Sequence, residues 1–218
     1  MVKKRVSVYV DGFNLYHAIK ELCIKELCID KLCIEGCKQE HLKWVNLWDL
    51  SEKLVCENEE VTVVKYFSAY ARWLEPNYRR HQLYVKFLEK QGVTFIEGRF
   101  KRKRVKCQAK CQKRYQTREE KETDVNIGVH LMADGLNDRF DRALVISADT
   151  DLNGAVELTS KETNKQIHIV APPGRRKKNS KSLFEIKEQQ LQDSLLPQQI
   201  THEDNKITRP TEYDPPQN

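Results

Sequence analysis

Short apolar runs alternate along the chain with longer stretches in which apolar residues recur at helical spacing. Strands are predicted where β-branched and aromatic residues cluster, over residues 6–10, 61–67, 93–96, 142–147 and 166–170. Helices are predicted from residue 15 onward and over residues 44–55, 76–91, 119–136, 151–163 and 180–192. Because strands and helices alternate throughout, the pattern predicts an α/β fold with a mainly parallel sheet and helices on both faces.

The length and composition fit one domain. Of the 218 residues, 39% are hydrophobic and 32% are charged, which leaves enough apolar content for a core. No run reaches the roughly 18 apolar residues of a membrane-spanning helix, so the sequence excludes a transmembrane protein and we expect no membrane partner. The run 6–10 is too short for an export signal, so we expect a cytoplasmic protein whose seven cysteines are thiols. Six of the seven prolines follow residue 171, and we expect a domain over 1–196 and an irregular tail over 197–218.

Positive charge is concentrated in one segment. The chain has 38 Lys and Arg against 32 Asp and Glu, and residues 99–118 contain ten basic residues and no acid. Such a run repels itself unless a polyanion neutralises it, and RNA is the polyanion that we expect. The predicted RNA contacts are Lys101, Arg102, Lys103 and Arg104 of this basic loop, together with Lys121. The alternative is a solvated loop without a partner.

Residues 21–37 interrupt the helical pattern. They contain three near-copies of a five-residue unit, ELCIK, ELCID and KLCIE, followed closely by Cys37. Five residues advance a helix by about 500°, so Cys23, Cys28 and Cys33 cannot share one helical stripe. The C-x₂-C spacing of zinc sites is absent here, and we interpret the repeat as a duplication inserted after the helix start.

Acidic residues follow two of the predicted strands. Asp11 ends the first strand, with Asn14 three residues on, and Asp149 and Asp151 follow the strand over 142–147. Ligands bind at the carboxyl ends of strands in open α/β sheets, and closely spaced carboxylates with like charge favour a shared Mg²⁺ ion. The alternative roles are an Asx turn or helix cap for Asp11 and a helix cap for Asp151.

Another acid opens a predicted helix. Asp124 shares a helical face with Ile127, Gly128 and Leu131, and we expect that face to be buried. A carboxylate there needs a partner, either Lys121 one turn earlier or a cation. We therefore expect Asp11, Asp124, Asp149 and Asp151 to form one metal site.

Three motifs follow one another along the chain in the order Asp11-x-x-Asn14, Lys121-x-x-Asp124 and Ser147-x-Asp149-x-Asp151. With these motifs the sequence resembles the NYN domain family, in its LabA-like branch, within the PIN-like nuclease superfamily. The resemblance covers most of the chain through VDGFNLYHAIK, VKYFSAY, GVTFIEGRFKRK, EEKETDVNIGVHLMADG, VISADTDLNGAVE and IHIVAPPGRRKKNS. It implies a PIN-like three-layer α/β/α sandwich, a Mg²⁺ or Mn²⁺ cofactor held by the four acids, and cleavage of RNA. It also implies that Asn14 and Ser147 belong to the catalytic set. The repeat over 21–37 departs from the family pattern, as does Ala148, where glycine is expected.

Other functions remain open at this point. An RNA-binding adaptor with a structural acid cluster fits the same residues, and so does a D-x-D phosphatase or a topoisomerase-primase-like enzyme. Those two enzyme classes place D-x-D or Glu, respectively, on the first strand, whereas this chain has Asp11 there and D-x-D late. We expect a single-stranded RNA substrate, and the sequence is compatible with a homo-oligomer.

Overall fold

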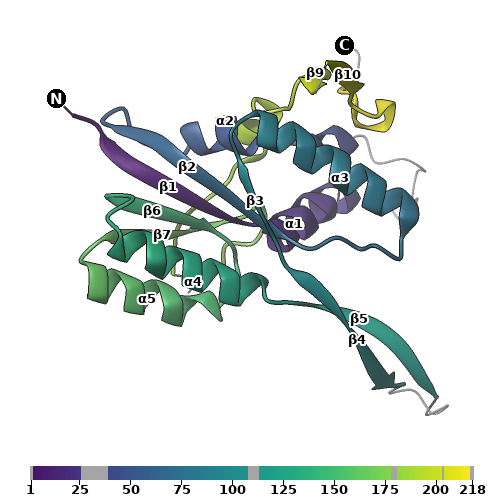
Figure 1. Ribbon diagram of the computed structural model, residues 1–218, viewed down its shortest axis with the longest axis horizontal. Coiled ribbons are helices and arrows are strands. Elements are labelled where there is room, and N and C mark those ends of the chain that lie inside the picture. Colours follow the sequence, from purple (N-terminus) through teal and green to yellow (C-terminus); the bar gives the residue numbers. More distant parts are fainter. Residues whose placement is uncertain (1, 26–38, 108–112, 178–180, 203, 217–218) are drawn as a thin grey trace.

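A parallel sheet forms the centre of the protein. The computed structural model describes residues 2–25, 39–107, 113–177, 181–202 and 204–216. Within these ranges, six parallel strands pair in the order β3-β2-β1-β6-β7-β8 (Figure 1). The strands are β1 (Lys4–Asp11), β2 (Glu59–Ser68), β3 (Thr94–Glu97), β6 (Arg142–Ile146), β7 (Gln166–Ala171) and β8 (Ser182–Glu185). The predicted α/β class is confirmed.

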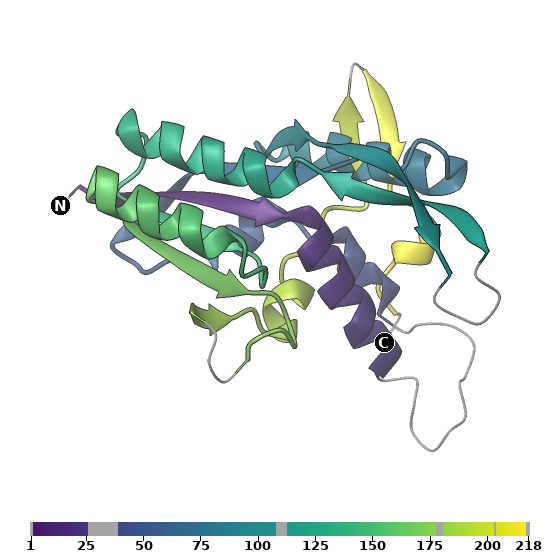
Figure 2. The same cartoon turned by 90° about the horizontal axis from the view of Figure 1, so that it is seen from below.

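Helices cover both faces of the sheet (Figures 1 and 2). One face carries α1 (Gly12–Lys25), α2 (Leu47–Glu52) and α3 (Glu75–Lys90), and the other carries α4 (Thr123–Leu136) and α5 (Leu152–Thr163). Val8 and Val10 of β1 pack in the same apolar cluster as Leu15 of α1, whereas Tyr9 packs with Ile127 of α4. Because side chains alternate between the faces of a strand, β1 contributes to both cores and a three-layer sandwich results.

The basic segment is a β-hairpin rather than the loop that we predicted. The strands β4 (Arg99–Lys106) and β5 (Arg114–Lys121) pair antiparallel and project away from the sheet (Figure 1). Eight residue pairs join them, from Arg99 opposite Lys121 to Lys106 opposite Arg114. Backbone pairing needs no apolar side chains, so the charge run did not reveal these strands.

Two predicted helices begin later than the sequence indicated. Residues 40–44 form a 3₁₀ helix, η1 (Glu40–Trp44), and Asn46 then caps α2 by accepting hydrogen bonds from the backbone N–H groups of Trp48 and Asp49. Residues 119–121 belong to β5, because they pair with residues 99–101 of β4. The helix expected over 119–136 therefore begins at Thr123.

The end of the chain is more ordered than predicted. The helix expected over 180–192 is the edge strand β8 followed by α6 (Glu188–Gln192). The expected tail over 197–218 contains the hairpin β9 (Gln199–His202) and β10 (Asn205–Thr208) and a 3₁₀ helix, η2 (Thr211–Tyr213). Tyr213 stacks on Trp44 with ring centroids 5.1 Å apart, so burial of an aromatic ring anchors this segment to η1.

The cysteine repeat lies mostly outside the described residues. Its first unit, residues 21–25, ends α1, and residues 26–37 are not described. Among the helices of the described residues, none is long and apolar enough to cross a membrane.

Candidate active site

The predicted site residue Asp11 lies at the carboxyl end of β1, beside the end of β6. The pairing of Val10 with Ile146 brings Ser147 next to it. Asp11 is 5% exposed, and both of its carboxylate oxygens accept hydrogen bonds. Oδ1 accepts from the backbone N–H of Asn14 at 3.0 Å, and Oδ2 accepts from the Ser147 hydroxyl at 2.9 Å. The two strand ends are thus joined through side chains.

The loop after β6 folds around the same point. The Asn14 side-chain oxygen accepts a hydrogen bond from the backbone N–H of Ala148 at 3.0 Å, and the Ser147 Oγ accepts one from the backbone N–H of Asp149 at 3.0 Å. Asp149 Oδ1 in turn accepts from the backbone N–H of Asp151 at 2.9 Å. Asp151 precedes α5, but its side chain makes no capping hydrogen bond. The methyl group of Ala148, where glycine was expected, is compatible with this turn.

A glycine is required where the chain passes from β1 into α1. A Cβ atom on Gly12 would lie 2.5 Å from the Tyr66 ring and 2.7 Å from the carbonyl oxygen of Phe67. Only a residue without a side chain fits so close to the neighbouring strand. This contact holds the start of α1, and with it Asn14, against the end of the sheet.

Asp124 reaches the site from the first turn of α4. Because α4 leads into the amino end of β6, its own amino end lies at the carboxyl edge of the sheet. Ile127 and Leu131 on the predicted buried face are buried, but Asp124 itself is exposed, so its expected burial was wrong. The helix emerges from the sheet edge at this residue. Lys121 does not pair with it and instead lies 3.2 Å from Glu119.

Three carboxylates at this edge have raised pKa values, mainly because of burial and further because of neighbouring carboxylates. Burial is the main cause that raises the pKa of Asp11 to about 6, with the charges of Asp124 and Asp149 adding to it against the opposing hydrogen bonds. The Asp124 carboxylate is partly shielded from water although the residue is exposed, and this desolvation, followed by the charges of Asp149 and Asp151, raises its pKa. Burial, followed by Asp11 and Asp124, raises the pKa of Glu120 to about 8. These acids therefore occupy one region of like charge, which we call the acid edge (Asp11, Glu120, Asp124, Asp149 and Asp151).

The acid edge offers oxygen ligands for a hard cation. No group of three or more His, Cys, Asp or Glu side chains within the described ranges is arranged to hold a metal ion. Mg²⁺, however, usually keeps several waters and takes only one or two carboxylates from the protein. A divalent cation would also offset the repulsion between these carboxylates, which adds to burial in raising the pKa values of Asp11, Glu120 and Asp124. The chemistry of the donor set thus fits such an ion.

Comparison with known proteins identifies the family. The family model of the NYN domain matches residues 5–192. The chain belongs to the NYN domain family. NYN domains are part of the PIN-like nuclease superfamily, so the resemblance that the motifs indicated is confirmed.

Individual relatives of this NYN domain are distant. The 6-hydroxy-3-succinoylpyridine 3-monooxygenase HspA of Pseudomonas putida (strain DSM 28022 / S16) is 23% identical over 205 residues, covering 77% of this chain and 59% of that protein. The chain thus spans about three fifths of the relative's length. The crystal structure of VPA0982, a protein of unknown function from Vibrio parahaemolyticus RIMD 2210633, matches with a TM-score of 0.56 at 16% identity. That match covers 89% of this chain and 98% of the other, and it shows a shared fold.

The basic hairpin of this NYN domain has two unlike faces. Paired residues of neighbouring strands share a face. On one face Lys101, Lys103 and Lys121 surround Glu119, which lies 2.9 Å from Lys103. The other face, which we call the arginine face, carries Arg102 opposite Arg118 and Arg104 opposite Gln116. The predicted RNA contacts are thus divided between a face with ion pairs and a face on which Arg102, Arg104 and Arg118 form no ion pair within the described residues.

A further basic group borders the acid edge. Ser147 and Asp149 line a cavity of about 230 Å³ together with Arg175, Lys177 and Lys181, which follow β7. Arg175 pairs with Glu21 at 2.6 Å, and Lys181 pairs with Glu157. The segment GRRKKNSK carries these cations, but their place beside Asp149 was not predicted from the sequence. Glu120 was not predicted either, because its place at the acid edge depends on the hairpin.

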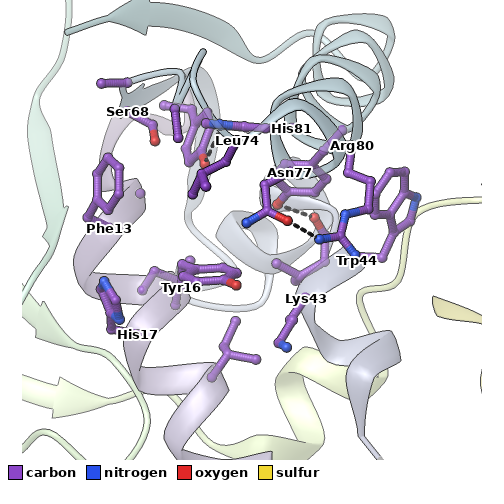
Figure 3. Close-up of a pocket in the computed structure, with 18 of the residues that line it drawn as sticks. Phe13, Tyr16, His17, Lys43, Trp44, Ser68, Leu74, Asn77, Arg80 and His81 are labelled. Atoms are coloured by element: carbon purple, nitrogen blue, oxygen red, sulfur yellow. Dashed lines mark hydrogen bonds between the residues drawn. The ribbon is translucent and has the colours of Figure 1, made fainter. Parts of the chain in front are cut away.

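An aromatic cavity lies beside Gly12 and Phe13, the two residues that follow Asp11 (Figure 3). Its volume is about 320 Å³, and residues of α1, η1, β2, α3 and β4 line it. Figure 3 shows Phe13 and Tyr16 of α1 facing His81 and Asn77 of α3 across the cavity. The acid edge is therefore flanked by a basic cavity and an aromatic one.

Proposed function

We propose that this NYN domain is a metal-dependent ribonuclease that cleaves RNA internally, hydrolysing phosphodiester bonds at the acid edge with Mg²⁺ or Mn²⁺ as cofactor. The observation that carries the proposal is the hydrogen-bonded set Asp11, Ser147 and Asp149. None of the acid-edge carboxylates forms an ion pair with a basic residue of the described chain. Membership of a nuclease superfamily supports the assignment.

The residues at the acid edge have different roles in this proposal. Of Asp11, Asp124, Asp149 and Asp151, one or two would bind the cation directly and the others would contact its bound waters. When bound, Mg²⁺ or Mn²⁺ lowers the pKa of water and offsets the negative charge of a phosphate. Asn14 and Ser147 hold both oxygens of Asp11 in a defined orientation before any ligand arrives. No serine, cysteine or histidine nucleophile is needed in this chemistry.

The basic residues supply the contacts to the RNA backbone. Arg102, Arg104 and Arg118 form the arginine face on one side of the acid edge, and Arg175 and Lys177 border Asp149 on the other side. Phosphate contacts from arginine and lysine give affinity without reading sequence. We expect a single strand that passes from the hairpin across the acid edge toward the loop after β7.

The decisive experiment is cleavage of an unstructured, end-labelled RNA by purified protein. We expect cleavage with Mg²⁺ or Mn²⁺, loss of cleavage with a chelator, and loss of cleavage in Asp149→Asn. Asp138→Asn is the matched control, because Asp138 lies at the opposite end of the sheet and pairs with Arg5 at 3.1 Å. RNA binding without cleavage by any of these proteins would contradict the enzyme and favour an RNA-binding adaptor.

The relative's name and the aromatic cavity favour a second candidate, chemistry on a small heteroaromatic acid. The relative is named for an activity on a succinoylpyridine. Here the aromatic cavity lies beside Gly12, the residue after Asp11, and includes Arg80, a cation that pairs with the Glu212 carboxylate at 3.1 Å and is suited to a second carboxylate. Binding of pyridine carboxylates by isothermal calorimetry, measured beside RNA binding, separates the two candidates.

A further inference from the structure

The aromatic cavity opens directly beside the acid edge. Gly12 and Phe13, the two residues after Asp11, both line it. Its volume of about 320 Å³ lies within the range of roughly 300–1,000 Å³ that is typical of ligand sites. A ligand bound there would lie next to the carboxylates that we propose to cleave RNA.

The wall of this cavity is largely aromatic. Six of its rings belong to Phe13, Tyr16, Trp44, Tyr66, Trp73 and Phe100. Tyr16 is 44% exposed and Trp73 is 37% exposed, although both are large rings. Exposed apolar surface that gathers at one place marks an interaction site, and ring faces favour a planar aromatic partner.

A few polar groups interrupt the aromatic wall. They include Ser68, Asn77 and His81. The Nε2 atom of His81 lies 3.3 Å from the Tyr66 hydroxyl oxygen, and burial lowers the pKa of His81 to about 4, so its imidazole is neutral at neutral pH. Hydroxyl, amide and neutral imidazole groups both donate and accept hydrogen bonds, as the edge of a nucleobase requires.

The mouth of the cavity is continuous with the arginine face. The ring of Phe100, in β4, meets Trp73 edge-on with centroids 4.7 Å apart and meets Phe13 edge-on at 5.4 Å. The Arg118 guanidinium lies 4.0 Å from the centroid of the Trp73 ring. In the hairpin register Phe100 is opposite Glu120, so the arginine face ends between the cavity and the acid edge. A small free ligand has no need of such a cationic approach, whereas a polyanion does.

We propose that the aromatic cavity binds one unpaired nucleobase of an RNA strand, stacked against Tyr16 and Trp73, beside the phosphate that is cleaved. This inference rests on the proposed ribonuclease function and adds a base-binding subsite to it. The strand's phosphates follow the arginine face, and the base turns into the cavity.

The test measures binding rather than cleavage. Asp149→Asn protein with a chelator present is titrated with a single-stranded oligoribonucleotide that carries 2-aminopurine at each position in turn. Tyr16→Leu or Trp73→Leu is then combined with Asp149→Asn. Each substitution should weaken RNA binding about 5- to 150-fold, which is the loss of affinity expected when the stacking of one base is removed. Tyr115→Leu is the matched control, because Tyr115 is 55% exposed on the hairpin face opposite Phe100 and should leave binding unchanged.

Removal of one base from the RNA completes the experiment. With an abasic nucleotide at the bound position, the parent protein should bind as weakly as the double variant Tyr16→Leu with Trp73→Leu binds intact RNA, and this double variant should lose nothing more. If the substitutions and the removal of the base instead weakened binding independently, so that their fold-losses multiplied, the base would not bind in this cavity and the subsite would be overturned. Equal binding of intact RNA by the parent, Tyr16→Leu and Trp73→Leu, all with native melting curves, would also overturn it while the ribonuclease proposal stands. A parent that binds no RNA contradicts both proposals. Displacement of the oligonucleotide by pyridine-3-carboxylate, but not by a mononucleotide, would assign the cavity to a small acid.

Discussion

The two edges of the central sheet carry carboxylates in opposite electrostatic settings. At the amino ends of the strands, Glu59 accepts hydrogen bonds of 2.7 and 3.0 Å from Arg142. Asp141 at the same edge accepts three from the backbone and guanidinium of Arg5, between 2.8 and 3.2 Å. At the carboxyl ends, Asp11 has hydroxyl and amide donors but no basic partner in the described chain.

The pKa values follow this contrast. The Arg5 hydrogen bonds lower the pKa of Asp141 to about 2. Burial opposes ionisation of Glu59, yet the Cys56 backbone N–H and Arg142 outweigh it and lower the pKa. The pKa values of Asp11, Glu120 and Asp124 are raised instead. An acid with a lowered pKa stabilises the fold when ionised, and an acid with a raised pKa destabilises it. The same residue type therefore serves stability at one edge and is available to a ligand at the other.

The largest effect is expected from breaking a pair at the amino edge. Arg142→Met leaves Glu59 buried and ionised without its partner, so we expect a loss of about 3–5 kcal/mol in the free energy of unfolding. Urea denaturation followed by circular dichroism measures it. The double variant Glu59→Gln with Arg142→Met should recover most of the loss, because no unpaired charge remains. A single variant as stable as the parent would show that the pair contributes nothing to the fold.

Substitution of Asp11, an acid without a basic partner in the described chain, should lower activity but not stability. Asp11→Asn should lower RNA cleavage by at least about 100-fold. Even substitution of residues that only hydrogen-bond to metal ligands lowers metal affinity or activity about 10- to 100-fold. The melting temperature of Asp11→Asn with a chelator should stay the same or rise, because the substitution removes a buried charge that is repelled by its neighbours. Differential scanning fluorimetry and a cleavage assay on one preparation measure both. A fall of several degrees would make Asp11 a structural residue.

The sequence predicted this contrast only in part. Apolar runs identified the strands over 6–10 and 142–147, and the carboxyl ends of those strands placed Asp11 and Asp149 near each other. Glu120 was missed because its place depends on the pairing of β5 with β4, which charged residues do not reveal. The aromatic cavity was missed because its walls come from residues as distant as Phe13 and Tyr213. Local pattern predicts elements, whereas long-range packing decides such surfaces.

Cations near the acid edge should likewise contribute to RNA binding and not to the stability of the fold. Replacing Arg102 and Arg104 with serine should flatten the dependence of log K for RNA on log salt by about 1.4, about 0.7 for each phosphate that is no longer neutralised. Stability should not fall, because Arg102 lies opposite another arginine, Arg118. Filter binding at several salt concentrations measures the slope. The matched variant replaces Lys101 and Lys103, whose face also holds Glu119, and should change the slope less. An equal change in both variants would show that the two faces contact RNA alike.

The smallest effect is expected in an acid titration, which tests whether an ionised carboxylate stabilises the fold at one edge and destabilises it at the other. The pKa of Asp141 falls from 3.8 to about 2 on folding, so its stabilisation is complete above about pH 4 and is lost as pH falls toward 2. Asp141→Asn should therefore lower the melting temperature at pH 6 and flatten its dependence on pH between 4 and 2. The side chain is 38% exposed, so the change should stay within the roughly 1 kcal/mol of a solvent-screened ion pair. Asp124→Asn, measured with a chelator, is the control of opposite sign, because the raised pKa of Asp124 means that its charge opposes folding at pH 6. Should both variants lower the melting temperature at pH 6 by the same amount, the two edges would not differ in the way that their pKa values indicate.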